Sequence, residues 1–297
     1  MFKKILDLGK AAVSGWVDDF APSMGAALAY YTMFSIAPLL LIVIAVAALV
    51  FGHDAAQNAI MEQLRGLLGQ EGASAVETML KNASQPKSGI IAGVIGIGTL
   101  ILGATTVLAE LESALDRIWG VVRDRGDSGI WNFIRTRVLS MGMIFGVGFL
   151  LLVSLVVSAG LGAWGGYISA QFPGAGVLLK VANFVLSFLV LTLLFAALYK
   201  FLPSRRLRWR DVWVGAAVTA LLFTVGRYLI GLYIGASGVA SGYGAAGAFI
   251  VLLVWIYYSA QIFLLGAEFT KAYAQGQGSV RSVARIIRRD SMPKAGS

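Results

Sequence analysis

Arg227 is the residue whose surroundings most need a chemical explanation. It lies in the stretch FTVGRYLIGLYIG, residues 223–235, among glycine, aromatic and aliphatic residues. A guanidinium in such a run can extend to the lipid headgroups at the outer membrane face. Alternatively, it can bind a phosphate or carboxylate through two hydrogen bonds in a cavity open to the exterior. The residue types leave both explanations open. Asn183, near the external end of an earlier apolar run, shares the predicted level of Arg227.

Three further polar residues lie within or at the ends of apolar runs. Gln261 falls at about mid-depth of the last run and needs a partner inside the protein. Glu110 and Glu268 close two runs at the predicted cytoplasmic level. Ion pairs with neighbouring basic residues are favoured there over a proton-coupled site.

Tyr30, Tyr31 and Pro38 place two phenols and a predicted helix kink in one apolar run, because proline removes a backbone hydrogen bond. We include both tyrosines among the predicted ligand-binding residues and assign Pro38 a structural role. Gly231 and Gly235 have the four-residue spacing that lets helices approach closely. Close packing within the chain explains this spacing before dimerisation does.

The remaining residue types argue against an enzyme. The chain has one histidine, His53, and no cysteine, whereas zinc and similar ions need several nitrogen or sulfur ligands. It has no glycine-rich phosphate loop after a strand and no serine-hydrolase or zinc-protease motif. We therefore predict no catalytic residue, no metal and no cofactor.

The elements that position these residues are transmembrane helices. Of the 297 residues, 58% are hydrophobic and 13% are charged, whereas soluble domains contain about 25% charged residues. Apolar runs of about 20 residues predict membrane-spanning helices. The six predicted spans cover approximately residues 25–51, 89–109, 138–160, 177–199, 212–234 and 245–269. The predicted fold is an all-α membrane protein with a six-transmembrane-helix bundle over residues 23–275.

The net charge of +9 comes from basic residues on one side of the membrane. Most of the 24 Lys and Arg residues lie before the first span, in the second and fourth loops, and after the last span. The positive-inside rule then predicts that both termini are cytoplasmic. In the fourth loop, PSRRLRWR, the predicted contacts for anionic lipid headgroups are Arg205, Arg206, Arg208 and Arg210. This distribution points to membrane lipids as partners and not to nucleic acid.

Four segments outside the spans have predicted structures of their own. Residues 1–22 have helical apolar spacing that fits either an amphipathic helix on the inner leaflet or a helix packed on the bundle. Residues 53–88 predict two short helices in an external hairpin, with capping-box spacing at Ser74 and Glu77. Its apolar faces cover either the mouth of the bundle or a partner protein. The second loop predicts a cytoplasmic helical hairpin, and residues 276–297 predict a basic cytoplasmic tail.

Four stretches together resemble the YihY/BrkB family. They are GAALAYYTMFSIAPLLLIVI in the first span, LAELESALDRIWGV after the second, LPSRRLRWRDVWVGA before the fifth and YGAAGAFIVLLVWIYYSAQIFLLGAEFTKAYA in the sixth. The resemblance covers nearly the whole chain in order. The family's recurrent positions correspond here to Tyr30, Tyr31, Pro38, Trp119, Pro203, Arg205, Arg206, Trp209, Tyr243, Gly244, Trp255, Gly266 and Glu268. Asp116 departs from the asparagine of many relatives.

The resemblance implies a multi-pass protein of the bacterial cytoplasmic membrane, associated in some members with serum resistance and in others with lipid or lipopolysaccharide handling. An older family label, ribonuclease BN, is not supported by these residues. We expect a protein that binds or transports a lipid or other anionic amphiphile. The alternative is a scaffold for envelope assembly that recruits a protein through residues 54–87, and a small-solute permease or channel is a third possibility.

Overall fold

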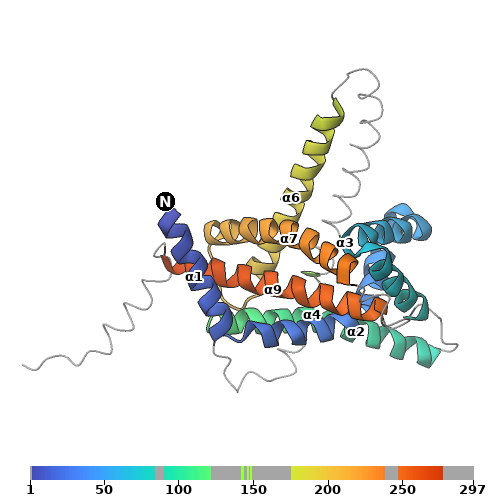
Figure 1. Ribbon diagram of the computed structural model, residues 1–297. Coiled ribbons are helices and arrows are strands. Elements are labelled where there is room, and N and C mark those ends of the chain that lie inside the picture. The colour runs from blue at the N-terminus through green and yellow to red at the C-terminus, as the bar shows by residue number, and fades with distance from the viewer. Residues whose placement is uncertain are drawn as a thin grey trace, which may run out of the picture.

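The computed structural model describes residues 2–83, 90–121, 175–237 and 247–276, together with residues 142, 143, 146 and 148. Its helices are α1 (Phe2–Asp18), α2 (Ala21–Phe51), α3 (His53–Ala83), α4 (Ile90–Ile118), α6 (Ala175–Phe201), α7 (Trp209–Ser237) and α9 (Gly247–Gly276). Figure 1 shows them as a bundle from which one part of α6 projects. The all-helical prediction is confirmed over this part of the chain.

Four of these helices are long and apolar enough to cross a membrane. The spans are Ala21–Leu49, Val181–Phe201, Trp209–Tyr233 and Phe249–Gly276. They correspond to the first, fourth, fifth and sixth predicted spans, and α4 occupies the position of the second. Nearly all of the third predicted span, the return of the cytoplasmic hairpin and the basic tail lie outside the described residues. The count of six spans and the side of each terminus stay predictions.

Helix α9 lies at the centre of the bundle and packs against α1, α2, α3, α4 and α7. Small residues allow its closest approach to α7. A Cβ atom at Gly215 of α7 would overlap Thr270 of α9, and one at Gly266 of α9 would overlap Thr219 of α7. Each threonine donates a hydrogen bond to the glycine carbonyl on its own helix, at 2.8 Å for Thr219 and 2.7 Å for Thr270. The two hydroxyls are therefore satisfied inside an apolar interface, as buried polar groups require.

A buried tyrosine joins three helices in the larger apolar core. The hydroxyl of Tyr199 on α6 donates to the carbonyl oxygen of Phe263 on α9 at 2.7 Å. The same hydroxyl lies 3.0 Å from Thr219 Oγ1 on α7. The ring packs with Phe195 and Phe263 at centroid distances of 6.4 Å and 5.0 Å. This contact fixes the C-terminal half of α6 against α7 and α9.

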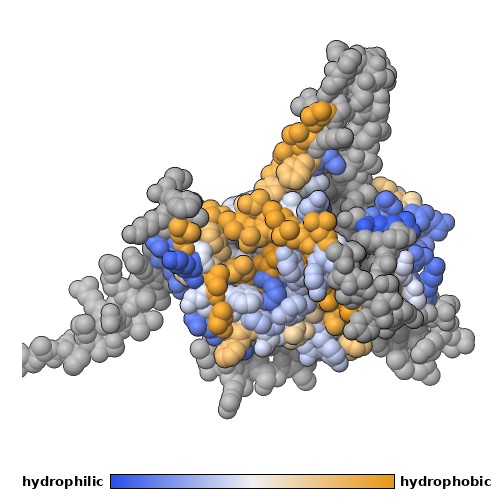
Figure 2. Space-filling model, viewed as in Figure 1, coloured by the Kyte–Doolittle hydropathy of each residue, from blue (hydrophilic) through white to orange (hydrophobic). Residues whose placement is uncertain are grey.

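The N-terminal half of α6 projects from the other described helices (Figure 1). Its large apolar side chains Val181, Phe184, Val185 and Leu189 are exposed. Figure 2 shows that hydrophobic residues also gather along α7. Apolar exposure of this extent is what a lipid-facing surface requires.

Helix α3 differs from the predicted hairpin. Residues 53–83 form one continuous helix, so the predicted break before Ser74 is absent. Thr78 instead donates to the carbonyl oxygen of Ser74 at 2.9 Å, as in the interior of a helix. The apolar side of α3, including Val76 and Leu80, packs in a cluster with residues of α2 and α9. The apolar face therefore covers the protein's own helices, and the capping-box prediction was wrong because tertiary packing continues the helix through Ser74.

Helix α1 combines the two structures that residues 1–22 allowed. One side packs on α9, where Gly15 lies against the carboxylate of Glu268. The other side exposes an apolar stripe formed by Leu6, Val13 and Val17. Helix α1 is thus attached to the bundle while its apolar stripe stays exposed.

Candidate functional site

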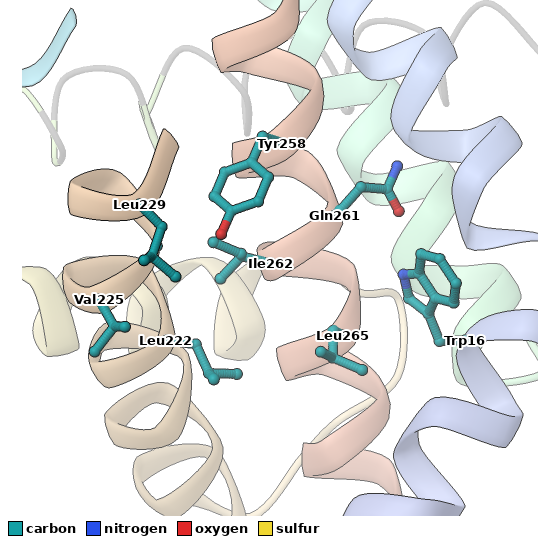
Figure 3. A pocket seen from close by; sticks show the side chains of 9 residues that line it. Trp16, Leu222, Val225, Leu229, Tyr258, Gln261, Ile262 and Leu265 are labelled. Carbon is teal, nitrogen blue, oxygen red and sulfur yellow. The ribbon is translucent and has the colours of Figure 1, made fainter. Parts of the chain in front are cut away.

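A groove of about 310 Å³ crosses the face of α9. Figure 3 shows α9 as its floor, α7 as one wall and Trp16 of α1 at the opposite edge. The groove is lined by Trp16, Leu222, Val225, Gly226, Leu229, Tyr258, Gln261, Ile262 and Leu265. The lining is aliphatic and aromatic with a few polar atoms, which is the usual composition of a site for an apolar ligand.

Gly226 sets the width of the groove on the α7 side. A Cβ atom there would lie 2.5 Å from Ile262 Cδ1 and 3.1 Å from the hydroxyl oxygen of Tyr258. Any larger residue would push these two side chains of α9 out of place. Only glycine at position 226 is therefore compatible with this arrangement of α7 and α9.

Two polar atoms at the α1 edge of the groove make no hydrogen bond. They are the indole Nε1 of Trp16 and the amide Oε1 of Gln261, and both are buried. Figure 3 shows Gln261 extending from α9 toward Trp16, with its oxygen on the side of the indole ring. The amide nitrogen of Gln261 donates to the carbonyl oxygen of Ala21 at 3.5 Å. Buried donors and acceptors without partners are rare and costly, so this pair marks the groove as a candidate binding site.

An ion-pair network lies next to this edge and holds α1 and α2 on α9. Lys271 Nζ is 2.8 Å from Asp19 Oδ2 and 3.3 Å from Glu268 Oε2. Glu268 is buried, and its Oε1 makes no hydrogen bond. Asp19 lies in the turn directly after α1, so the network fixes the end of the helix that carries Trp16. Among the described residues, no group of three or more His, Cys, Asp or Glu side chains could hold a metal ion.

The pKa of Asp19 is lowered from its ordinary value of 3.8. Burial of the carboxylate acts in the opposite direction, but hydrogen bonds with Glu268 and Lys271 and the positive charges of Lys271 and Arg117 outweigh it. Asp19 is therefore an anion at neutral pH and a counter-charge for Lys271.

The structure brings only part of the predicted site together. Gln261 lines the groove and Glu268 belongs to the adjacent network. Arg227 and Asn183 have exposed side chains on α7 and α6, and neither lines the groove. Glu110 is half-buried on α4.

The aromatic and structural residues of the prediction lie on α2 and α7. Tyr30 and Tyr31 are exposed on α2, with ring centroids 5.6 Å apart. The Pro38 ring faces Gly103 of α4, where a Cβ would lie 3.0 Å from Pro38 Cγ. At Gly231, a Cβ would meet nothing within 4 Å, so the close helix approach predicted there is not seen among the described atoms. Gly235 is helical, near the end of α7.

The basic loop between α6 and α7 is held by a buried acid. Both oxygens of Asp116 accept hydrogen bonds from Ser204, one from its backbone N–H and one from its hydroxyl, each at 2.8 Å. Arg205 donates to the carbonyl oxygen of Trp119 at 3.2 Å. The exposed basic residues of the loop and the start of α7 are Arg206, Arg208 and Arg210. Arg205 thus has a structural partner, whereas the other three face outward.

Sequence reasoning missed Trp16, Gly226 and Tyr258 as lining residues and Asp19 as the partner of Lys271. The small residues Gly15 and Gly25 were the available signal. A Cβ at Gly15 would overlap the Glu268 carboxylate, and one at Gly25 would overlap the Gln261 amide. These two glycines indicate which residues of α1 and α2 face Glu268 and Gln261 of α9. The signal can be used only when the rotation of each helix is known.

The comparisons with known proteins identify a family of membrane proteins. The family model described as "Virulence factor BrkB" matches residues 12–285. A UPF0761 membrane protein of Pseudomonas aeruginosa (strain UCBPP-PA14) is 30% identical over 285 residues, covering 94% of this chain and 64% of the relative. A UPF0761 membrane protein of Psychromonas ingrahamii is 31% identical over 267 residues, covering 82% of this chain and 79% of the relative.

The chain therefore spans just under two thirds of the length of the Pseudomonas aeruginosa relative and most of the length of the Psychromonas one. No solved structure matches this chain. The family match covers nearly all of the described helices, including the C-terminal part of α1, all of α9 and every residue that lines the groove. This chain is a membrane protein that belongs to the virulence factor BrkB family.

Proposed function

We propose that this membrane protein binds a lipid or related amphiphile in the groove over α9, as a carrier or transporter and not as an enzyme. The observation that supports the proposal is an apolar groove with two unpartnered polar atoms at one edge, Trp16 Nε1 and Gln261 Oε1. An amphiphile has the matching chemistry, because its chain suits the aliphatic walls and its polar end suits the two free groups.

The surface next to the groove supports lateral entry from a bilayer. Leu222, Val225 and Leu229 line the groove and are exposed. Leu221, Tyr228 and Leu232 on the same helix are also exposed. Lipid chains in contact with this side of α7 would thus meet the groove without crossing a polar barrier.

The exposed arginines of the α6–α7 loop and the start of α7 contribute a second lipid contact in this proposal. Each basic residue near an anionic leaflet is worth about 1 kcal/mol of attraction. Arg206, Arg208 and Arg210 would hold this end of the protein at anionic headgroups of the cytoplasmic leaflet. With the chain's two termini on that same side, the protein would lie in the bacterial cytoplasmic membrane.

The scaffold alternative has less support from the described residues. It requires residues 54–87 to offer a surface to a partner, but the apolar side of α3 is already packed on α2 and α9. The outer side of α3 carries exposed ion pairs such as Lys81 with Glu77. Such pairs contribute little to binding.

The test compares lipids retained by two glycine variants of α7. Gly226→Ala places a methyl group into the groove, whereas Gly231→Ala places one where nothing lies within 4 Å. Both substitutions raise helix propensity by the same amount, about 1 kcal/mol. The proteins are extracted into polymer nanodiscs, delipidated in matched steps and analysed by mass spectrometry. We expect wild type and Gly231→Ala to keep a lipid that Gly226→Ala loses. Identical bulk lipid in all three would refute binding in the groove.

The proposed topology is tested separately. Because the chain has no cysteine, single cysteines introduced at Ser14 and at Ser237 report their own side by labelling with a membrane-impermeant maleimide in intact cells. We expect no labelling at Ser14 until the cells are opened and immediate labelling at Ser237. The reverse pattern would contradict cytoplasmic termini.

A further inference from the structure

The groove lacks the groups that an anionic headgroup needs. Its nine lining residues include no Asp, Glu, Lys, Arg or His. The positive charge of the adjacent ion-pair network, on Lys271, is already paired with Asp19 and Glu268. Arg227 is exposed on α7 and does not line the groove. A phosphate or carboxylate in the groove would therefore lose its water without gaining a counter-charge, which is strongly unfavourable.

The two unpartnered atoms define the polar group that fits. Trp16 Nε1–H is a donor only, and the amide oxygen of Gln261 is an acceptor only. The orientation of the amide is set by its nitrogen, which donates to the carbonyl oxygen of Ala21. The reverse orientation would place two oxygens against each other. A single ligand group at this edge must therefore accept one hydrogen bond and donate another, as a hydroxyl does.

We infer that the groove selects an uncharged amphiphile with a hydroxyl group at its polar end, of the diacylglycerol or long-chain alcohol class. Both unpartnered atoms are buried, so binding requires a side-chain movement at this edge. The hydroxyl then accepts from Trp16 Nε1 and donates to Gln261 Oε1, while the chain lies along Leu222, Leu229 and Ile262. This inference rests on the proposed function and narrows it, since the sequence alone suggested an anionic amphiphile.

The test uses three lipids with the same acyl chains. Dioleoylglycerol has the free hydroxyl, its O-acetyl ester lacks the donor, and dioleoyl phosphatidate carries a charge in its place. Binding to the full chain in detergent is measured by native mass spectrometry. Wild type is compared with Trp16→Phe, Gln261→Met and the double variant. The double variant removes both polar atoms together, so neither of them is left buried without a partner, and it should fold.

We expect wild type to bind dioleoylglycerol about tenfold more tightly than either other lipid, as two hydrogen bonds of ordinary strength allow. Gln261→Met and the double variant should lose the preference over the ester, because the acceptor for the hydroxyl is gone. Trp16→Phe should bind dioleoylglycerol more weakly than wild type does. Equal or tighter binding of phosphatidate would overturn the inference. So would an unchanged preference in the variants, which would show that Trp16 and Gln261 satisfy each other. If wild type binds none of the three and Gly226→Ala is indistinguishable from it, the proposed function itself fails.

Discussion

Lys271→Met is the substitution whose energetic effect follows most directly from the structure. Methionine keeps an unbranched apolar chain, so the packing of the lysine stem is largely preserved. The ammonium group is lost, and with it the contacts of 2.8 Å to Asp19 and 3.3 Å to Glu268. Asp19, the anionic partner of Lys271, is then left partly buried without its counter-charge.

Removing one partner of a buried ion pair costs about 3–5 kcal/mol. The lysine and Asp19 side chains are 24% and 26% exposed, so we expect the lower end, about 3 kcal/mol. The chain offers a matched control on α3. Lys81 Nζ lies 2.8 Å from Glu77 Oε1 with 69% of the lysine side chain exposed. For Lys81→Met we therefore expect a loss of about 0–1 kcal/mol.

The assay is unfolding of each variant in mixed detergent micelles, followed by circular dichroism. A second variant, Lys271→Met with Asp19→Asn, removes both charges of the pair and should recover more than half of the loss, because no partly buried anion is then left unpaired. Our account of the network is refuted if Lys271→Met costs no more than Lys81→Met. It is also refuted if adding Asp19→Asn gives no recovery.

Three further predictions follow from other residues. The pKa of Asp19 is lowered from 3.8. The contribution of Asp19 to stability is therefore fully present above pH 3.8 and is lost as pH falls through the lower pKa of the folded state. Melting curves between pH 7 and pH 2.5 should show a steeper loss of stability for wild type than for Asp19→Asn. Tyr199→Phe removes the hydroxyl that bonds to Phe263 O and should cost about 1 kcal/mol in the same unfolding assay, and no measurable cost would argue against that hydrogen bond. Arg227→Gln should leave the retained lipid in nanodiscs unchanged, because Arg227 does not line the groove; loss of a defined lipid would restore Arg227 as a ligand contact.

Much of the fold was predictable because the membrane imposes a local rule. A membrane-spanning helix must form all of its backbone hydrogen bonds internally and expose apolar side chains to lipid. About 20 consecutive residues determine both properties. The first, fourth, fifth and sixth predicted spans correspond to helices of sufficient length and hydropathy. The hairpin expected around Ser74 was wrong because a capping-box pattern is only a local preference, and packing on α2 and α9 keeps residues 53–83 helical.

The site was less predictable because it depends on how the helices are rotated. Arg227 was predicted to bind a ligand because it is a charged residue in an apolar run. In the structure it is exposed on α7 and does not line the groove. Gln261 was correctly singled out as a polar residue in an apolar run, but its neighbour Trp16 is 245 positions earlier in the chain, on a helix assigned to the membrane surface or the bundle. No spacing rule connects the two.

The sequence by itself determined that this chain is a helical membrane protein of a recognisable family, because hydropathy and family motifs are properties of consecutive residues. The tertiary structure decided which polar groups meet. It placed Lys271 between Asp19 and Glu268, and it left Trp16 and Gln261 unpartnered at the edge of an apolar groove. Those outcomes depend on which face of α9 each neighbouring helix covers, and side-chain packing between helices sets that choice.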